Sequence, residues 1–227
     1  LETGDVVVSW LPLYHDMGLI AGFLMPILEA VPLVLMSPFD WVKAPARLMQ
    51  AVSSYHGTLT WLPNFAYIFC AQKIRDSQMD GIDLASWRAV INCSEPMHLH
   101  SFLQFAERFG RYGFRPEALA TSYAMAENVF GVTQGGIGQP VKIDEVDVIA
   151  LQAEGFARPI KDISNQSHPS VKMLSCGRPI AGTEVRVVGS DHATLPERWV
   201  GELAVRSNCM LTGYYNRPDA TKKAFHG

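Results

Sequence analysis

The stretch Asp5–Ile20, DVVVSWLPLYHDMGLI, joins the two halves of a β–α unit through a polar seam. The apolar run DVVVSWLP has the composition of a buried strand, and a helix is expected over residues 15–30. An imidazole and a carboxylate, His15 and Asp16, stand where the strand gives way to the helix. They either end one element and cap the next, or they face a ligand.

Strands and helices continue to alternate after this unit. PLVLMS is predicted as a second strand, and TLTWLP, WRAVINCSEP and ALATSYAMAEN as three more. Between them the spacing of apolar residues predicts helices over 38–57, from about Asn64, and over MHLHSFLQFAERFG. The first of these has Gly57 as its expected stop, and its buried face is expected to contain Trp41, Leu48, Met49 and Val52. This alternation indicates βαβ units and a mostly parallel sheet.

After about Gly131 the sequence changes in character. GVTQGGIGQPVKI is rich in glycine, and EVRVVG and GELAVRS alternate apolar and polar residues as half-buried antiparallel strands do. The predicted fold class is therefore α/β. A mostly parallel sheet with flanking helices is expected over residues 1–131, and a smaller β-rich, distorted barrel-like subdomain over residues 132–227.

The composition excludes several classes of protein. The 227 residues are 48% hydrophobic and 18% charged with a net charge of −3, which allows a sizeable core and gives no basic footprint for nucleic acid. The four cysteines lie far apart without a CxxC pair, which favours reduced thiols in the cytoplasm. The segment Gly18–Met36 is nearly long enough to cross a bilayer, but Pro26, Glu29 and Pro32 favour a buried helix and a strand. No integral membrane segment is expected.

Polar residues follow three of the apolar strands. They are Tyr14, His15 and Asp16 after the first strand, Ser94, Glu95 and Pro96 after AVINC, and Ser122, Tyr123 and Glu127 in TSYAMAEN. The carboxyl ends of parallel strands share one edge of a sheet, and ligands bind beyond that edge. We therefore expect these three corners to converge on one site.

Each corner also has a purely structural interpretation. Asp16 fits the N-cap of the helix that follows it. Ser94 fits a helix cap with Pro96 near the first helical position. The third corner fits a buried tyrosine and a solvated glutamate at the start of a helix. The run GYYNRP near the end of the chain fits an ordinary turn.

Five motifs occur in a fixed order along the chain, and three of them contain the three corners. WLPLYHDMGLI, NCSEPM, SYAMAEN, SCGRPIAGTEVRVV and GELAVRSNCMLTGYYNRPDAT together resemble the adenylate-forming superfamily of acyl- and amino-acid-activating enzymes, over essentially the whole chain. The chain is most similar there to the fatty acyl-AMP ligases, on LPLYHDMGLI and on SYAMAEN, in which Ala124 replaces a usual glycine. The segment from about Val141 to Ser170 also resembles an insertion of that family, associated with restraining its C-terminal domain.

The resemblance implies a role for each corner. His15 would lie beside the acyl carboxylate and the α-phosphate, and Glu127 would bind Mg²⁺. The adenine would be lined by Ser94, Glu95 and Pro96 and flanked by Ser122 and Tyr123. A tunnel for the acyl tail would have Phe23, Leu24, Trp61 and Phe65 in its wall.

The reaction implied is the attack of a fatty carboxylate on the α-phosphorus of ATP, which gives acyl-AMP and pyrophosphate and depends on positioning and charge neutralisation. The acyl group would then pass to an acyl carrier protein or to a polyketide or peptide synthase module. Three alternatives stay open: an acyl-CoA synthetase, an amino-acid-activating domain, which YHDMG fits less well, and a non-catalytic scaffold.

The resemblance also implies elements beyond these 227 residues. A phosphate loop is expected upstream of Leu1, and a TGD motif and a C-terminal domain with a catalytic lysine are expected after Gly227. The chain is therefore expected to be the central fragment of an N-terminal domain that does not catalyse adenylation alone.

Overall fold

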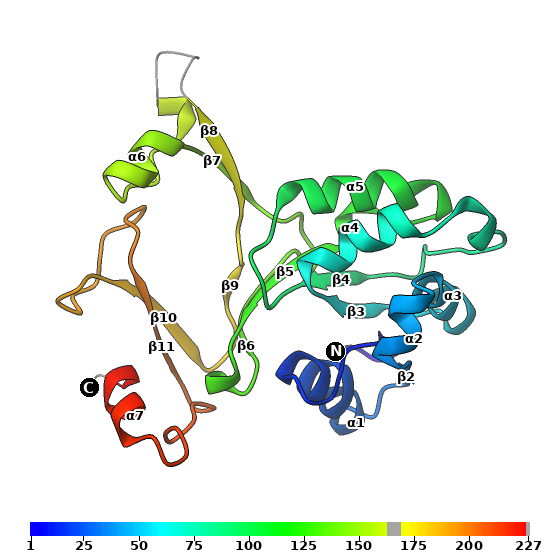
Figure 1. Cartoon of the computed structure of the whole chain (residues 1–227), viewed down its shortest axis with the longest axis horizontal. Coiled ribbons are helices and arrows are strands. Elements are labelled where there is room, and N and C mark those ends of the chain that lie inside the picture. Colours follow the sequence, from blue (N-terminus) through cyan, green and yellow to red (C-terminus); the bar gives the residue numbers. More distant parts are fainter. Residues whose placement is uncertain (163–168, 226–227) are drawn as a thin grey trace.

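The computed structural model describes residues 1–162 and 169–225, and its largest element is a seven-stranded sheet with helices on both faces (Figure 1). The strand order is β2-β1-β3-β4-β5-β6-β9; the first five strands are parallel, and β6 and β9 pair antiparallel. The strands are β1 (Val7–Ser9), β2 (Leu33–Leu35), β3 (Leu59–Leu62), β4 (Ala89–Asn92), β5 (Leu119–Ala124), β6 (Gly131–Gly135) and β9 (Arg178–Pro179). The prediction of a mostly parallel α/β sheet is confirmed.

Two smaller antiparallel sheets follow, and the strands predicted at EVRVVG and GELAVRS form one of them. One pairs β7 (Ile143–Asp147) with β8 (Ser170–Leu174), and the other pairs β10 (Thr183–Val188) with β11 (Glu202–Ser207). Both lie to one side of the main sheet (Figure 1). Strands β6 and β9 come at or after residue 131 and still belong to the main sheet, so the strand pairing does not mark a boundary there. The division of the chain near residue 131 stays a prediction. The expected insertion, residues 141–170, contains β7, α6 and β8, and its residues 163–168 lie outside the described part.

The helices occupy the connections between strands. The first connection is a π-helix, η1 (Met17–Leu24), that runs into α1 (Met25–Leu28). The other α-helices are α2 (Pro38–Lys43), α3 (Ala46–Tyr55), α4 (Asn64–Lys73), α5 (Leu99–Phe109), α6 (Val148–Ala153) and α7 (Pro218–Ala224). The short 3₁₀ turns are η2 (Asp76–Gln78), η3 (Gly110–Tyr112), η4 (Pro116–Ala118), η5 (Ala126–Asn128) and η6 (Ile160–Asp162). Within residues 1–162 and 169–225, no helix has the length and apolar character needed to cross a membrane.

The single helix predicted over 38–57 is two helices, because Pro45 removes a backbone donor and disfavours helical geometry at the residue before it. The four residues expected on its buried face are all buried. Its stop is one residue earlier than predicted. His56 holds the left-handed position with φ of 52°, while Gly57 is required for space, since a Cβ there would lie 2.6 Å from a methyl of Val8.

The core contains the central strands and helices α4 and α5, which run side by side along one face of the sheet (Figure 1), together with buried residues of α2 and α3. Strands β3 and β4 are buried at every residue, as expected for the middle of a parallel sheet. Tyr67 on α4 packs edge-on against Phe105 on α5 with ring centroids 5.1 Å apart, and its hydroxyl donates to the Val90 carbonyl. These contacts hold both helices on β4.

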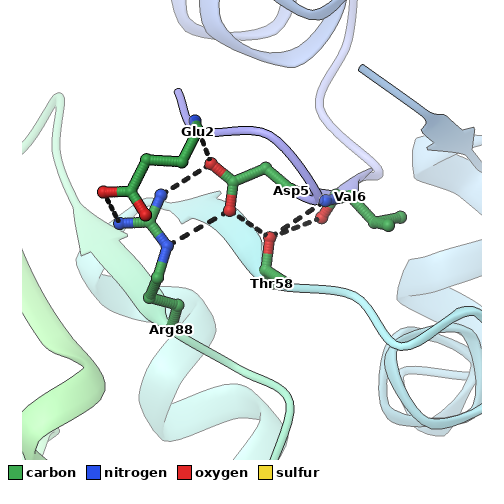
Figure 2. A network of polar contacts seen from close by, with 5 residues as sticks. All are labelled: Glu2, Asp5, Val6, Thr58 and Arg88. Atoms are coloured by element: carbon green, nitrogen blue, oxygen red, sulfur yellow. Dashed lines mark hydrogen bonds and ion pairs between the residues drawn. The ribbon is translucent and has the colours of Figure 1, made fainter.

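A polar network joins the amino ends of three parallel strands (Figure 2). Asp5 precedes β1 and is 3% exposed, Thr58 precedes β3, and Arg88 precedes β4. Arg88 donates to both carboxylate oxygens of Asp5, at 3.1 and 2.6 Å, and the Thr58 hydroxyl and the Glu2 amide donate to the same carboxylate. Burial alone would raise the pKa of Asp5, but these hydrogen bonds outweigh it and hold the pKa below its usual value.

Candidate functional site

The strand order defines where a ligand is expected. From β1 the chain crosses to β2 on one side, and from β3 onward it proceeds to β4 and β5 on the other side. The direction therefore reverses between β1 and β3, and open α/β sheets bind ligands at the carboxyl end of such a reversal. A pocket of about 250 Å³ lies at this point. Its wall is formed by Trp10, Leu11, Pro12, His15, Met17, Gly18, Pro63, Phe65, Ser94 and Glu95.

Residues that follow β1, β3 and β4 thus meet in one pocket. The wall is mostly apolar, and the polar groups come from His15, Ser94 and Glu95. Two of the three predicted corners, from the ends of β1 and β4, are therefore brought together as the parallel sheet predicts. The end of β3, which carries Pro63 and Phe65, contributes a part of the wall that the polar corners did not indicate.

The glycine in the YHDMG motif is required by the shape of this pocket. A Cβ on Gly18 would lie 2.2 Å from the Pro12 carbonyl oxygen, which is closer than any real side chain approaches. The first turn of η1 is therefore packed directly on the backbone that precedes His15. This close packing explains why the second residue of η1 is a glycine.

His15 and Asp16 interact with each other and with the start of η1. His15 Nδ1 lies 2.7 Å from Asp16 Oδ1, and the Met17 amide donates to Asp16 Oδ1 at 2.8 Å. The same amide lies 3.2 Å from His15 Nδ1, but this nitrogen cannot accept a hydrogen while it donates one to Asp16. Whether His15 Nδ1 donates to Asp16 or accepts from the Met17 amide, this nitrogen is engaged, and Nε2 is left for a ligand at the pocket. The cap predicted for Asp16 is confirmed, and the His15 side chain is half exposed.

The second corner is a strained turn and not a helix cap. Ser94 has a φ of +73°, a conformation that is uncommon without glycine and concentrates at functional sites. Helix α5 begins only at Leu99, so the prediction of Ser94 as its cap was wrong. The turn is held instead by α4: Glu95 Oε1 accepts from the Phe65 amide at 2.5 Å, and Asn64 Oδ1 accepts from the His98 amide at 3.1 Å.

The third corner lies on and after β5. Ser122 is 4% exposed and donates to the Thr133 carbonyl at 2.8 Å, while the Tyr123 amide donates to the Thr133 hydroxyl oxygen at 3.2 Å. Both contacts join β5 to β6, and the register between these strands shifts just after Tyr123. The buried Cys93 thiol connects this corner to the second, because its neighbours include Ser94 at 3.6 Å and the Ser122 hydroxyl. Burial raises the pKa of the Cys93 thiol.

Glu127 lies in η5, the turn after β5, and is half-buried. Its Oε1 accepts a hydrogen bond from the Tyr214 hydroxyl at 2.7 Å. No group of three or more histidine, cysteine or acidic side chains that could hold a metal occurs in the described residues. A single carboxylate with a second oxygen to spare fits Mg²⁺ nonetheless, because this ion usually takes one or two protein carboxylates and completes its shell with phosphates and water.

The candidate residues fall into two groups by position. His15, Ser94 and Glu95 line the pocket, whereas Pro96, Ser122, Tyr123 and Glu127 are not part of its wall. Of the four residues expected around the acyl tail, Phe65 lines this pocket and Phe23, Leu24 and Trp61 do not.

Two features of the site were missed in the sequence. Trp10 lines the pocket, is 5% exposed, and stacks on Trp41 with ring centroids 3.7 Å apart and planes 4° from parallel. Its position immediately before LPLY was the available signal. Tyr214 was part of a run interpreted as a turn, and nothing in the local pattern indicated its contact with Glu127.

The fold and the edge site define an α/β enzyme domain of the nucleotide-binding kind. The model of a family described as AMP-binding enzyme matches residues 1–215. The chain belongs to this family, and the predicted membership of the adenylate-forming enzymes is confirmed.

Individual relatives within this family include ligases that act on fatty acids. Over 98% of its length, the chain is 34% identical to the long-chain-fatty-acid–AMP ligase FadD28 of Mycobacterium tuberculosis and 33% identical to JamA of Moorena producens, a medium-chain-fatty-acid–[acyl-carrier-protein] ligase. The structure of a fatty acyl-adenylate ligase from L. pneumophila, in complex with acyl adenylate and pyrophosphate, matches the whole chain with a TM-score of 0.92 and 33% identity. The chain spans 37% of the length of both relatives and 39% of that structure.

Proposed function

We propose that this chain forms the central part of an enzyme that activates a fatty acid with ATP, giving acyl-AMP and pyrophosphate, and then passes the acyl group to an acyl carrier protein. The observation that carries the proposal is the apolar pocket at the reversal of the sheet, with an imidazole at its polar side. Relatives named as fatty-acid–AMP and fatty-acid–[acyl-carrier-protein] ligases support the same substrate class.

The acyl chain enters the pocket with its carboxylate toward His15. At about 250 Å³ the pocket is slightly smaller than the range of about 300–1,000 Å³ usual for small-molecule sites, so it holds the first part of the acyl chain. Met17 and Phe65 supply apolar contacts there. The half-exposed imidazole donates from Nε2 to the carboxylate or to the α-phosphate, while Asp16 fixes the orientation of the ring.

In the adenylation step one carboxylate oxygen forms a bond to the α-phosphorus, and the bond from that phosphorus to the bridging oxygen of pyrophosphate breaks. The residues of the second and third corners bind the nucleotide: the backbone of the Ser94 turn and the side chain of Tyr123 contact the adenine, with Glu95, Pro96 and Ser122 around them. Glu127 would hold Mg²⁺, which would supply neutralisation of the phosphate charge when bound. Catalysis of this type depends on placing the reactants and stabilising charge, and requires no covalent nucleophile.

Fatty-acid-dependent ATP–pyrophosphate exchange tests the proposal on the full-length protein that contains this segment. His15→Gln is expected to reduce exchange by about 10²-fold, within the range for loss of a group that stabilises charge in the transition state. His100, exposed on α5 away from the pocket, is the matched control, and His100→Gln should retain wild-type exchange. Equal rates for the two variants would contradict the role of His15.

The acceptor is tested separately by supplying either a phosphopantetheinylated carrier protein or coenzyme A to the preformed acyl-AMP. Acylation of the carrier protein without a CoA thioester is expected. Rapid formation of acyl-CoA would support the acyl-CoA synthetase alternative. Absence of both exchange and binding of a non-hydrolysable acyl-AMP analogue would favour a non-catalytic scaffold.

A further inference from the structure

The turn that carries Glu127 is strained. Val129, two residues later, has φ of 64° and ψ of −53°, and the Phe130 amide donates across it to the Asn128 carbonyl at 2.7 Å. This is a γ-turn of the rare kind with positive φ, and a β-branched residue adopts it at a cost of about 1–3 kcal/mol. Such a conformation persists only where surrounding contacts hold it.

Part of that support comes from residues 207–214, which begin at the last residue of β11 and which we call the tether. The Leu211 amide donates to the Glu127 carbonyl at 2.8 Å, and the Ser207 hydroxyl forms a short hydrogen bond with Asn128 Oδ1. The third contact is the one from the Tyr214 hydroxyl to Glu127 Oε1. The tether therefore binds the backbone of the turn, its neighbouring amide side chain, and the carboxylate.

Tyr214 is itself held in place by helix α7. Its amide donates to the Thr221 hydroxyl oxygen at 2.9 Å, and that hydroxyl donates to the Arg217 carbonyl at 3.0 Å. This arrangement accounts for the spacing of glycine, tyrosine and threonine in GYYNRPDAT. The next residue, Tyr215, is 91% exposed. Two adjacent tyrosines thus differ sharply: one contacts the proposed metal ligand and the other faces solvent.

The Tyr214 hydroxyl donates to Glu127 Oε1 at 2.7 Å, and a carboxylate oxygen that accepts one such bond is fixed in direction. One carboxylate oxygen is occupied by this donor. No described residue hydrogen-bonds or ion-pairs with the other, Oε2. An ionised carboxylate held by one strong hydrogen bond keeps a single orientation and presents its remaining oxygen to a cation.

We propose that Tyr214 is a positioning residue for Mg²⁺, which acts by holding the Glu127 carboxylate so that Oε2 faces the ion. The inference rests on the proposed function, in which Glu127 binds Mg²⁺. It makes the metal site depend on the tether, a segment more than 80 residues away in the sequence. The GYYNRP run is then part of the active-site machinery and not a turn alone.

The test is the free Mg²⁺ concentration that gives half-maximal Mg²⁺-dependent binding of a non-hydrolysable ATP analogue, measured by calorimetry without turnover in the full-length protein. Tyr214→Phe removes one oxygen and should raise this concentration about three- to tenfold, the effect of losing a partly exposed hydrogen bond to a charged group. Tyr215→Phe is the matched control and should leave it unchanged. A merely structural role would lower stability or maximal rate without moving the Mg²⁺ dependence, and that result would overturn the proposal.

A double-mutant cycle separates this inference from the proposed function. Glu127→Gln should itself shift the Mg²⁺ dependence, and in that background Tyr214→Phe should add no further shift. Additive shifts would overturn the positioning role and leave Glu127 as a ligand. A wild-type Mg²⁺ dependence in Glu127→Gln would instead overturn the metal role of Glu127, and the positioning role with it. If Tyr214→Phe does not fold, Ser207→Ala replaces it: a smaller shift in the same direction supports the proposal, and a wild-type value opposes it.

Discussion

Asp5→Asn should destabilise the protein by about 3 kcal/mol, because it breaks the charged network at the amino ends of β1, β3 and β4 (Figure 2). An asparagine is best tolerated with its amide nitrogen in place of Asp5 Oδ1. The Thr58 hydroxyl, which donates to Oδ1 in the wild type, can then donate to the Val6 carbonyl, 3.4 Å away. The nitrogen then faces Arg88 Nε, another donor, so one charge-assisted bond is lost and Arg88 keeps no buried counter-ion. Losing a bond to a charged group costs about 1.5–3 kcal/mol, and the unpaired charge adds to this.

Urea unfolding, followed by tryptophan fluorescence at pH 7, measures the effect, and about 3 kcal/mol corresponds to a melting temperature about 6–12 °C lower for a protein of this size. The sign of the pH dependence is also defined. The lowered pKa of Asp5 gives the wild type a stability contribution that is present above about pH 3.9 and is lost as pH falls through the folded-state pKa. The two proteins should therefore converge in stability as the pH falls below about 3.9 and through the folded-state pKa of Asp5.

Glu2→Gln is the control for this prediction. The Glu2 side chain is 71% exposed and lies 3.4 Å from Arg88, so its loss should cost less than about 0.5 kcal/mol. A change below about 1 kcal/mol for Asp5→Asn at pH 7, or a difference that does not shrink as the pH falls below about 3.9, would refute the reasoning.

Three further perturbations address the pocket. Gly18→Ala places a methyl group 2.2 Å from the Pro12 carbonyl oxygen and should raise the KM for the fatty acid in the exchange assay by about tenfold or more, whereas Gly110→Ala, with open space around its Cβ, should leave KM unchanged. Phe65→Ala enlarges the pocket and should shift the preferred acyl length upward when fatty acids of increasing chain length are compared. An unchanged preference would show that Phe65 does not contact the acyl chain. Glu95→Ala should cost about 0.5–1 kcal/mol in urea unfolding by freeing an amide at the start of α4, and Glu95→Gln less than that, since its amide oxygen still accepts.

Much of the fold could be predicted because its strongest signals are local. Apolar runs bounded by glycine and proline mark each parallel strand, and alternation of strands with helices determines that their carboxyl ends share an edge. The shared edge predicts that His15 and Ser94, which are 79 residues apart in the sequence, lie close together, and both line the pocket. The split of the helix at Pro45 was missed although proline is a local helix breaker, whereas the positive φ of Ser94 depends on how the chain packs and not on residue type alone.

The site was predictable only in part for the same reason. Polar residues at strand ends were visible in the sequence, but the pocket wall also needs Trp10 and Phe65, which look like ordinary core residues in a linear pattern. Glu127 follows β5 in the main sheet, and Tyr214 follows β11 in a smaller sheet. Their contact joins residues 87 positions apart, so a pattern of neighbouring residues does not indicate it. The roles of Ser122, Tyr123 and Glu127 toward a nucleotide stay predictions.

The stacked indoles of Trp10 and Trp41 give this protein an optical label of its own. Two parallel chromophores so close together couple their excited states and should produce a paired band in near-ultraviolet circular dichroism, distinct from the signal of the other tryptophans. Because Trp10 also forms part of the pocket wall, an occupant that moves Trp10 should change the overlap of the two rings. Loading can then be followed directly, without dye or radioactivity, even in variants that no longer turn over.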